Sequence, residues 1–263
     1  MRKLMWFVVA VALVACSKSS STDGTATTIR VAAASDLSKA FTEVGQKFQA
    51  KTKVEIQFDF GSSGLLAKQI EQGAPYALYA AANKSFAEQV AKSGKCDAST
   101  IQMYARGRVV VWTPDGVDKP ASLADLADPR FKRIAIANPD HAPYGVAAKQ
   151  ALEKAGVWDQ IKDRIVLGEN VQATLQYART KNADAALVAL SLSIVTDGGS
   201  ALPVDPSLHA PLDQALVVCG TGPGATAAKQ FADYLASAEG REIMKRYGFL
   251  LPGETAPDKT AAQ

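Results

Sequence analysis

The stretch TIRVAAASDLSKAFTEVGQKF, residues 28–48, joins an apolar run to a segment with apolar side chains at helical spacing. The run at residues 28–33 predicts a buried β-strand. The spacing of three to four positions predicts a helix, whose buried face would consist of Leu37, Phe41, Val44 and Phe48. The loop Ala-Ala-Ser-Asp at residues 33–36 lies between them, so the stretch predicts a strand, a loop and a helix.

The same unit recurs directly downstream. Residues 54–60 alternate apolar and polar side chains as a half-buried strand does, and Phe-Gly-Ser-Ser-Gly at residues 60–64 leads into a second helix. Further strands are predicted at residues 77–82 and 108–112, with a helix at 85–92 between them. Strands that alternate with helices predict an α/β protein with a mostly parallel sheet covered on both faces.

A second group of strands and helices follows. A strand is predicted at residues 134–137, and the loop at 138–145 leads from it into a helix at 145–155. Later strands are predicted at residues 165–167, 185–190 and 214–218, with a helix that begins at Asn170-Val171 and one long closing helix at 225–247. Residues 28–252 are therefore long enough for one large domain or for two lobes.

The serine-containing loops at residues 33–36 and 60–64 are the first candidates for a binding site. A helix N-terminus presents backbone N–H groups without an intrahelical acceptor and carries about half a positive charge. A hydroxyl side chain placed there can hold an oxyanion without a lysine or an arginine. If both loops face one cleft, the protein binds an anion. In the structural alternative, Ser35 only caps the following helix and the second loop is only a turn.

The first residues indicate export. Met1-Arg2-Lys3 is basic, and the apolar run that follows is too short to span a bilayer, as in a secretion signal. Leu13-Val14-Ala15-Cys16 resembles a bacterial lipoprotein signal, in which the cysteine is acylated and becomes the first mature residue. We therefore expect a lipoprotein signal peptide at residues 1–16 and a flexible tether at 17–27, with an ordinary signal peptide as the alternative.

Composition argues against several functions. The chain has 48% hydrophobic residues and a net charge of +3, and its basic residues are scattered among acids, which argues against nucleic-acid binding. Besides Cys16 there are only Cys96 and Cys219, without a CxxC motif or nearby histidines, so no cation site is expected. In an oxidising compartment these two could form a disulfide. Two buried thiols are the alternative, because spacing alone does not show that their Cα atoms lie within bridging distance.

Five segments, in order along the chain, resemble the signature segments of periplasmic molybdate-binding proteins, the capture subunits of molybdate ABC importers. They are VAAASDLSKAF (31–41), FDFGSSGLLAKQIEQGAP (58–75), IAIANPDHAPYGVAAKQALEKAGVW (134–158), GENVQATL (168–175) and KRYGFLLP (245–252). The resemblance implies a two-lobed periplasmic binding protein fold of type II-like topology. Each lobe would be a mostly parallel sheet flanked by helices, with the ligand in the cleft between the lobes.

The resemblance also implies how the chain is divided. Residues 28–108 would form the first part of lobe I, and residues 109–211 a crossing strand and lobe II. Residues 212–252 would cross back and complete lobe I, and residues 253–263 would be a flexible tail.

Carried over position by position, the resemblance implies four ligand contacts, which are Ser35, Ser63, Tyr144 and the backbone N–H of Val171. Ser62 and the backbone N–H of Asp36 are weaker candidates. A carboxylate repels a neighbouring dianion, so we expect the Asp36 side chain to turn away and cap the helix.

The chain departs from its relatives in two places. Many relatives carry a ligand-binding tyrosine near the end of a later strand, where this chain has Ala189. We expect Tyr144 to replace that donor, with Ser191 as the weaker candidate. The third strand, at residues 76–83, also lacks two acids and a serine that relatives usually have.

The implied function is the capture of molybdate and tungstate. The protein would act in the periplasm as a monomer, held at a membrane by a lipid anchor. The protein would use no cofactor and would deliver the anion to an ABC permease. Both anions are fully ionised at neutral pH, so a site made only of hydroxyl and N–H donors suits them. Two alternatives remain open, which are a binding protein for another oxyanion such as sulfate or phosphate, and a serine hydrolase built on Ser63 or Ser35.

Overall fold

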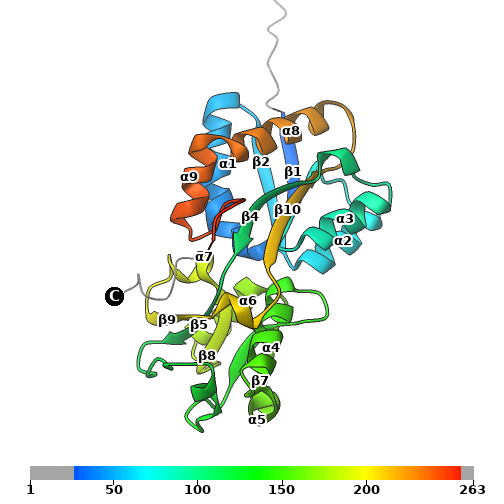
Figure 1. Cartoon of the computed structure of the whole chain (residues 1–263). Helices are drawn as coiled ribbons and strands as arrows, with labels where there is room; N and C mark the ends of the chain where they lie inside the picture. The colour runs from blue at the N-terminus through cyan, green and yellow to red at the C-terminus, as the bar shows by residue number, and fades with distance from the viewer. Residues whose placement is uncertain (1–26, 256–263) are drawn as a thin grey trace, which may run out of the picture.

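Two lobes, each built on a five-stranded sheet flanked by helices, make up residues 27–255, the part of the chain that the computed structural model describes (Figure 1). This architecture confirms the predicted two-lobed α/β fold. The predicted signal peptide at residues 1–16, which includes Cys16, lies outside the described residues. The same holds for residues 17–26 of the predicted tether and for residues 256–263 of the predicted tail.

The two sheets have the same plan. In lobe I the strand order is β2 (Glu55–Gly61), β1 (Thr28–Ala34), β3 (Leu78–Ala81), β10 (Leu212–Val218) and β4 (Gln102–Gly107). In lobe II it is β7 (Ile165–Gly168), β6 (Ile134–Ala137), β8 (Ala185–Ala189), β5 (Val109–Pro114) and β9 (Gly199–Pro203). The first three strands of each sheet are parallel, and the last two pair antiparallel.

The antiparallel strands are those next to the two passages between the lobes. The chain leaves lobe I after β4, passes Arg108 and enters lobe II as β5. It returns over residues 204–211, between β9 and β10. The strand predicted at 108–112 corresponds to β5, which begins directly after Arg108 and lies wholly in the sheet of lobe II.

Helices cover both sheets. The α-helices are α1 (Ser38–Thr52), α2 (Ser63–Glu71), α3 (Lys84–Lys92), α4 (Pro143–Lys154), α5 (Trp158–Ile161), α6 (Val171–Arg179), α7 (Leu190–Ser193), α8 (Gly222–Ala236) and α9 (Ala238–Arg246). Short 3₁₀-helices are η1 (Ser35–Leu37), η2 (Ala98–Thr100), η3 (Ala124–Ala127), η4 (Lys162–Arg164) and η5 (Pro206–Leu208). Within residues 27–255, no helix combines the length and the apolar character that crossing a membrane requires.

The face predicted for the first helix is the one that packs. Leu37, Phe41, Val44 and Phe48 are all buried in the core. The rings of Phe41 and Phe48 contact Phe231 of α8 edge to face, with centroids 5.7 and 5.5 Å apart. The first and the last parts of lobe I are therefore joined through aromatic packing.

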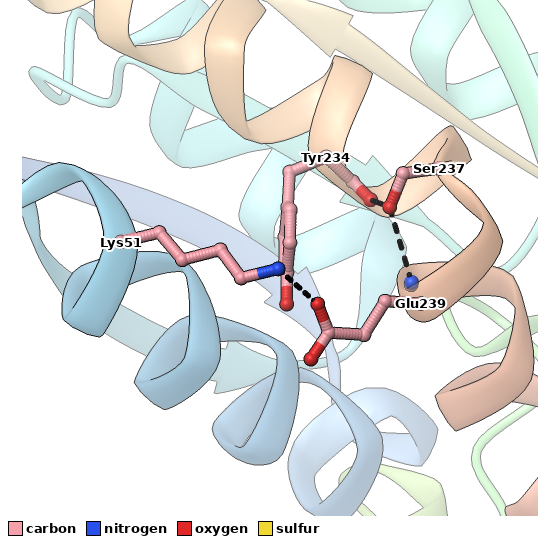
Figure 2. Close-up of polar contacts among 5 residues, drawn as sticks. Lys51, Tyr234, Ser237 and Glu239 are labelled. Carbon is pink, nitrogen blue, oxygen red and sulfur yellow. Dashed lines mark hydrogen bonds and ion pairs between the residues drawn. The ribbon is translucent and has the colours of Figure 1, made fainter.

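The closing helix predicted at residues 225–247 is wrong, because the structure has two helices there. Ser237 is extended, with φ −66° and ψ 166°, and separates α8 from α9. Its hydroxyl donates to the Tyr234 carbonyl (2.6 Å) and accepts from Gly240 N–H (3.3 Å), which caps the new helix. Figure 2 shows this cap beside the ion pair that joins Lys51 of α1 to Glu239 of α9.

Cys96 and Cys219 form a disulfide, with their Cα atoms 3.9 Å apart. This resolves the choice between a disulfide and two thiols. Cys96 follows α3 and Cys219 follows β10, so the bond lies within lobe I.

The fold brings the predicted loops together. The carboxyl ends of parallel strands lie at one edge of a sheet, where α/β proteins bind ligands. In lobe I these ends are those of β1, β2 and β3, and the pairing of Ala34 with Gly61 places the two serine loops side by side. In lobe II they are the ends of β6, β7 and β8, which lead into α4, α6 and α7. The edges of the two sheets face one another across the space between the lobes (Figure 1).

Candidate functional site

A cavity lies between the lobes at the carboxyl ends of their parallel strands. It encloses about 190 Å³, including the part open to solvent. Its walls come from five connections, and the lining residues are Ala34, Ser35, Asp36, Gly61, Ser62, Ser63, Ala82, Ala142, Pro143, Tyr144, Asn170 and Val171. All four predicted contacts and two of the three weaker candidates therefore share one cavity. The exception is Ser191.

Ser63 is held so that its hydroxyl proton can point at a ligand. It is the first residue of α2, and its hydroxyl oxygen accepts from Ala82 N–H at 3.1 Å. Its carbonyl accepts from the hydroxyl of buried Tyr79 at 2.7 Å. Because the oxygen already accepts one bond, the Ser63 hydroxyl can donate to an anion.

Ser35 meets the start of α6 from the opposite lobe. Its hydroxyl oxygen lies 3.4 Å from Gln172 N–H, a long hydrogen bond across the cavity. The Asn170 side chain caps α6 by accepting from Gln172 and Ala173 N–H. Val171 is the first residue of this helix, so its N–H has no intrahelical acceptor and is placed to donate to an anion.

The helix cap expected from the Asp36 side chain is wrong, because this side chain caps no helix. η1 and α1 have no side-chain cap, and the Asp36 carboxylate instead accepts from Nε2 of Gln214 at 2.5 Å. Asp36 is fully buried. Burial raises its pKa to about 6, against smaller lowering effects of the Gln214 and Tyr144 side chains. The pKa of this buried carboxyl group beside the cavity is thus raised towards neutral pH.

Tyr144 lines the cavity from α4 of lobe II, and its hydroxyl reaches into lobe I. The hydroxyl lies 3.5 Å from Gln214 Nε2. A Cβ atom on Gly107 would lie 2.1 Å from it, so only glycine leaves room there. Burial, and then the Asp36 charge, hold the Tyr144 pKa well above its usual value, so the phenol remains a neutral donor.

Ser191 is placed elsewhere. Its hydroxyl donates to the Asp36 backbone carbonyl at 2.7 Å and thereby ties α7 of lobe II to lobe I. It is buried and is not among the residues that line the cavity. This arrangement supports Tyr144 over Ser191 as a ligand contact.

His141, in the loop before α4, joins the two lobes next to the cavity-lining residue Ser62. Its carbonyl accepts from the Ser62 hydroxyl (2.6 Å) and from Gly64 N–H (2.9 Å), and its Nδ1 lies 2.8 Å from the same hydroxyl. Ser62 therefore joins the lobes, and its proton is used by the His141 carbonyl.

The lining has the chemistry of an anion site. Of the residues that line the cavity in the described part of the chain, none is a lysine or an arginine, and Asp36 is the only charged one. Hydroxyl groups and helix N-termini supply the donors. Within the same part of the chain, no group of three or more histidine, cysteine, aspartate or glutamate residues could hold a metal ion.

The sequence was compared with known protein families, and the match agrees with the two-lobed fold and its cavity. A family model described as "Bacterial extracellular solute-binding protein" matches residues 29–250. The chain belongs to this family. The cavity between the lobes is therefore the candidate solute site of this protein.

The relatives of this solute-binding protein include molybdate-binding proteins. It is 32% identical over 222 residues to the molybdate-binding protein ModA of Rhodobacter capsulatus, covering 83% of this chain and 86% of that one. It is 31% identical over 243 residues to a putative ABC transporter substrate-binding lipoprotein, YvgL, of Bacillus subtilis, covering 89% and 90%. A solved structure, the periplasmic molybdate-binding protein of Azotobacter vinelandii, matches with a TM-score of 0.79 and 27% identity, covering 85% and 99%.

Several residues of this solute-binding protein's site were not predicted from sequence. Asn170 lines the cavity and caps α6, and an asparagine directly before a helix is a standard cap signal that could have revealed it. Ala82 and Gln214 carry no such signal. Ala82 contributes only its backbone N–H, and Gln214 lies far along the chain from its partner Asp36.

Proposed function

We propose that this protein captures molybdate outside the cytoplasm and delivers it to an ABC importer. The observation that carries the proposal is the cavity between the lobes, lined by hydroxyl and backbone donors from both lobes and by no basic side chain. Molybdate has no proton to donate, so such a lining suits it. The names of the relatives point to the same anion. Tungstate has the same charge and shape and is a second ligand of the same site.

Neutral donors also suit a protein that must release its cargo. A buried ion pair with arginine would add a desolvation cost to each release. Hydroxyl and N–H donors hold the anion by several moderate bonds. Ser35, Ser63, Tyr144 and the N–H of Val171 are the proposed contacts, with the Asp36 N–H in support.

We also propose that the protein is not an enzyme and needs no cofactor. The Ser62 hydroxyl lies near a histidine, but it donates to the His141 carbonyl, so its proton is not directed to a general base. The Ser35 and Ser63 hydroxyl groups accept hydrogen bonds from backbone N–H groups, of Gln172 and Ala82, and not from a histidine.

We propose that a lipid on Cys16 attaches the protein to a membrane. We also propose that the protein acts as a monomer. The lipoprotein signal pattern at residues 13–16 and the lipoprotein among the relatives support the anchor. The partner would be the permease of the importer.

The experiment is a thermal-shift panel with molybdate, tungstate, sulfate, phosphate and chromate. A ligand at one hundred times its Kd stabilises the folded state by about 2.7 kcal/mol, which raises Tm by about 5 to 10 °C in a protein of this size. We expect such shifts with molybdate and tungstate only. No shift with either anion, or an equal shift with sulfate, would contradict the proposal.

A further inference from the structure

The Asp36 carboxyl group is only half satisfied. Oδ2 accepts from Gln214 Nε2 at 2.5 Å, whereas Oδ1 has no hydrogen-bond partner among the described residues. Asp36 is fully buried and lines the cavity. A buried polar atom without a partner costs about 1 to 3 kcal/mol, and a charged one costs more. The negative charge of an ionised Asp36 is therefore poorly stabilised, with only the Gln214 and Tyr144 side chains acting to lower its pKa.

Its surroundings offer no positive charge. The side chains that face the carboxyl group are Gln214 of β10, Tyr104 of β4 and Tyr144 of α4, and α7 contributes the Ser191 hydroxyl to the Asp36 carbonyl. Both tyrosines are neutral, because burial raises their pKa well above the usual value. No lysine or arginine in residues 27–255 forms an ion pair with Asp36.

The amide of Gln214 is held in one orientation. Tyr104 donates its hydroxyl to Gln214 Oε1 at 2.9 Å, so Nε2 is the atom directed at Asp36. Oδ2 is therefore fixed as an acceptor, and a proton on the carboxyl group belongs on Oδ1.

We propose that this cavity holds its oxyanion together with one proton carried on Asp36 Oδ1, so that capture of a doubly charged oxyanion takes up a proton. The inference rests on the proposed function and extends it. An ionised Asp36 beside a dianion would place three negative charges in a cavity without a cation. One proton, taken from water, neutralises the only negatively charged group that lines the cavity, while Oδ2 keeps its bond from Gln214.

The protonation state of Asp36 in the ligand-free protein determines how the affinity for the anion changes with pH. Burial raises the Asp36 pKa to about 6, so without anion the group is mostly ionised at neutral pH. A bound dianion raises this pKa further. Above the pKa of the free protein, each anion therefore binds with one proton, and the apparent Kd rises with pH by linkage.

The experiment is a calorimetric titration of the purified protein with molybdate at several pH values from about 6.5 to about 8.5. For the wild type we expect the apparent Kd to rise about tenfold per pH unit. Repeating the titration in buffers with different ionisation enthalpies should count about one proton taken up per anion at the highest pH.

Asp36→Asn is the matched variant, because its amide has nearly the same shape and stays neutral at every pH. We expect its Kd to stay constant over the pH range, with no proton uptake. Asp233→Asn, the same change at an exposed position of α8, should keep the wild-type pH dependence.

The outcomes separate the two proposals. Binding of molybdate by the wild type with a pH-independent Kd and no proton uptake would overturn this inference alone. If Asp36→Asn fails to fold, the wild-type proton count still decides. Absence of molybdate binding at every pH would overturn the proposed function and this inference with it.

Discussion

Burial of Asp36 in the folded protein disfavours the ionised form of its carboxyl group. In the unfolded chain an aspartate has its ordinary pKa of 3.8, and in the native protein burial raises the value to about 6. The native state therefore binds this proton more tightly than the unfolded state does. The stabilisation is complete below about pH 4 and is lost as the pH rises through about 6.

This gives a prediction for the ligand-free protein. A shift of about two pKa units corresponds to about 3 kcal/mol, so Asp36→Asn should raise the free energy of unfolding by up to that amount at pH 8. Most of the gain should disappear near pH 4, where the wild-type carboxyl group is neutral in the native state and partly protonated in the unfolded chain. Urea unfolding of both proteins at the two pH values, without oxyanion, measures it. A variant less stable than the wild type at pH 8 would show that the carboxylate has a stabilising partner.

At the scale of elements, the start of α2 and the loop before α4 form a contact between the lobes beside the cavity. Gly64 N–H donates to the His141 carbonyl at 2.9 Å, and a Cβ atom on Gly64 would lie 2.8 Å from that oxygen. A side chain at position 64 therefore forces the two elements apart. Alanine itself is compatible with the helix and favours it by about 0.8 to 1 kcal/mol.

Gly64→Ala should thus weaken binding, while the helix preference of alanine offsets part of the lost contact in the free protein. Loss of the Gly64 and Ser62 bonds to His141 should raise the Kd for molybdate by about tenfold or more, equivalent to at least about 1.4 kcal/mol. Titration calorimetry gives the affinity, and the Tm without ligand gives the stability. Gly224→Ala in α8 is the control, because its Cβ would meet only Ala77 at 4.0 Å. Equal affinities of Gly64→Ala and wild type would show that this contact does not contribute to capture.

The elements also show what the sequence can predict. Strand–loop–helix units are local, so periodicity located the loops after β1, β2, β6 and β7, which line the cavity. Two strands were missed, β4 and β9. β9 reads Gly-Ser-Ala-Leu-Pro and lies at a sheet edge, and its Gly and Pro are poor strand formers. The direction of the Asp36 side chain depends on Gln214, 178 positions away, and no local pattern encodes such a contact.

At the scale of the whole molecule, lobe II is inserted into a loop that lobe I closes. The Cys96–Cys219 disulfide joins residues 123 positions apart, and all five strands of lobe II lie between them. Val218 pairs with Leu78 and Ala215 with Ala81, so the disulfide lies at the end of β3 away from Ala82 and the cavity. The cross-link therefore constrains the chain topology without touching the site.

Removing this cross-link should separate stability from binding. A disulfide that closes a long loop restricts the unfolded chain, and its loss typically costs about 2 to 5 kcal/mol. We expect the double variant Cys96→Ala/Cys219→Ala to lose that much free energy of unfolding in urea, while its Kd for molybdate stays at the wild-type value. Alanine is chosen because both positions are buried. Dithiothreitol should destabilise the wild type to the same extent and leave the variant unchanged. A variant that unfolds like the wild type would contradict this separation. A folded variant that binds molybdate more weakly would also contradict it, because it would couple the far end of β10 to the cavity.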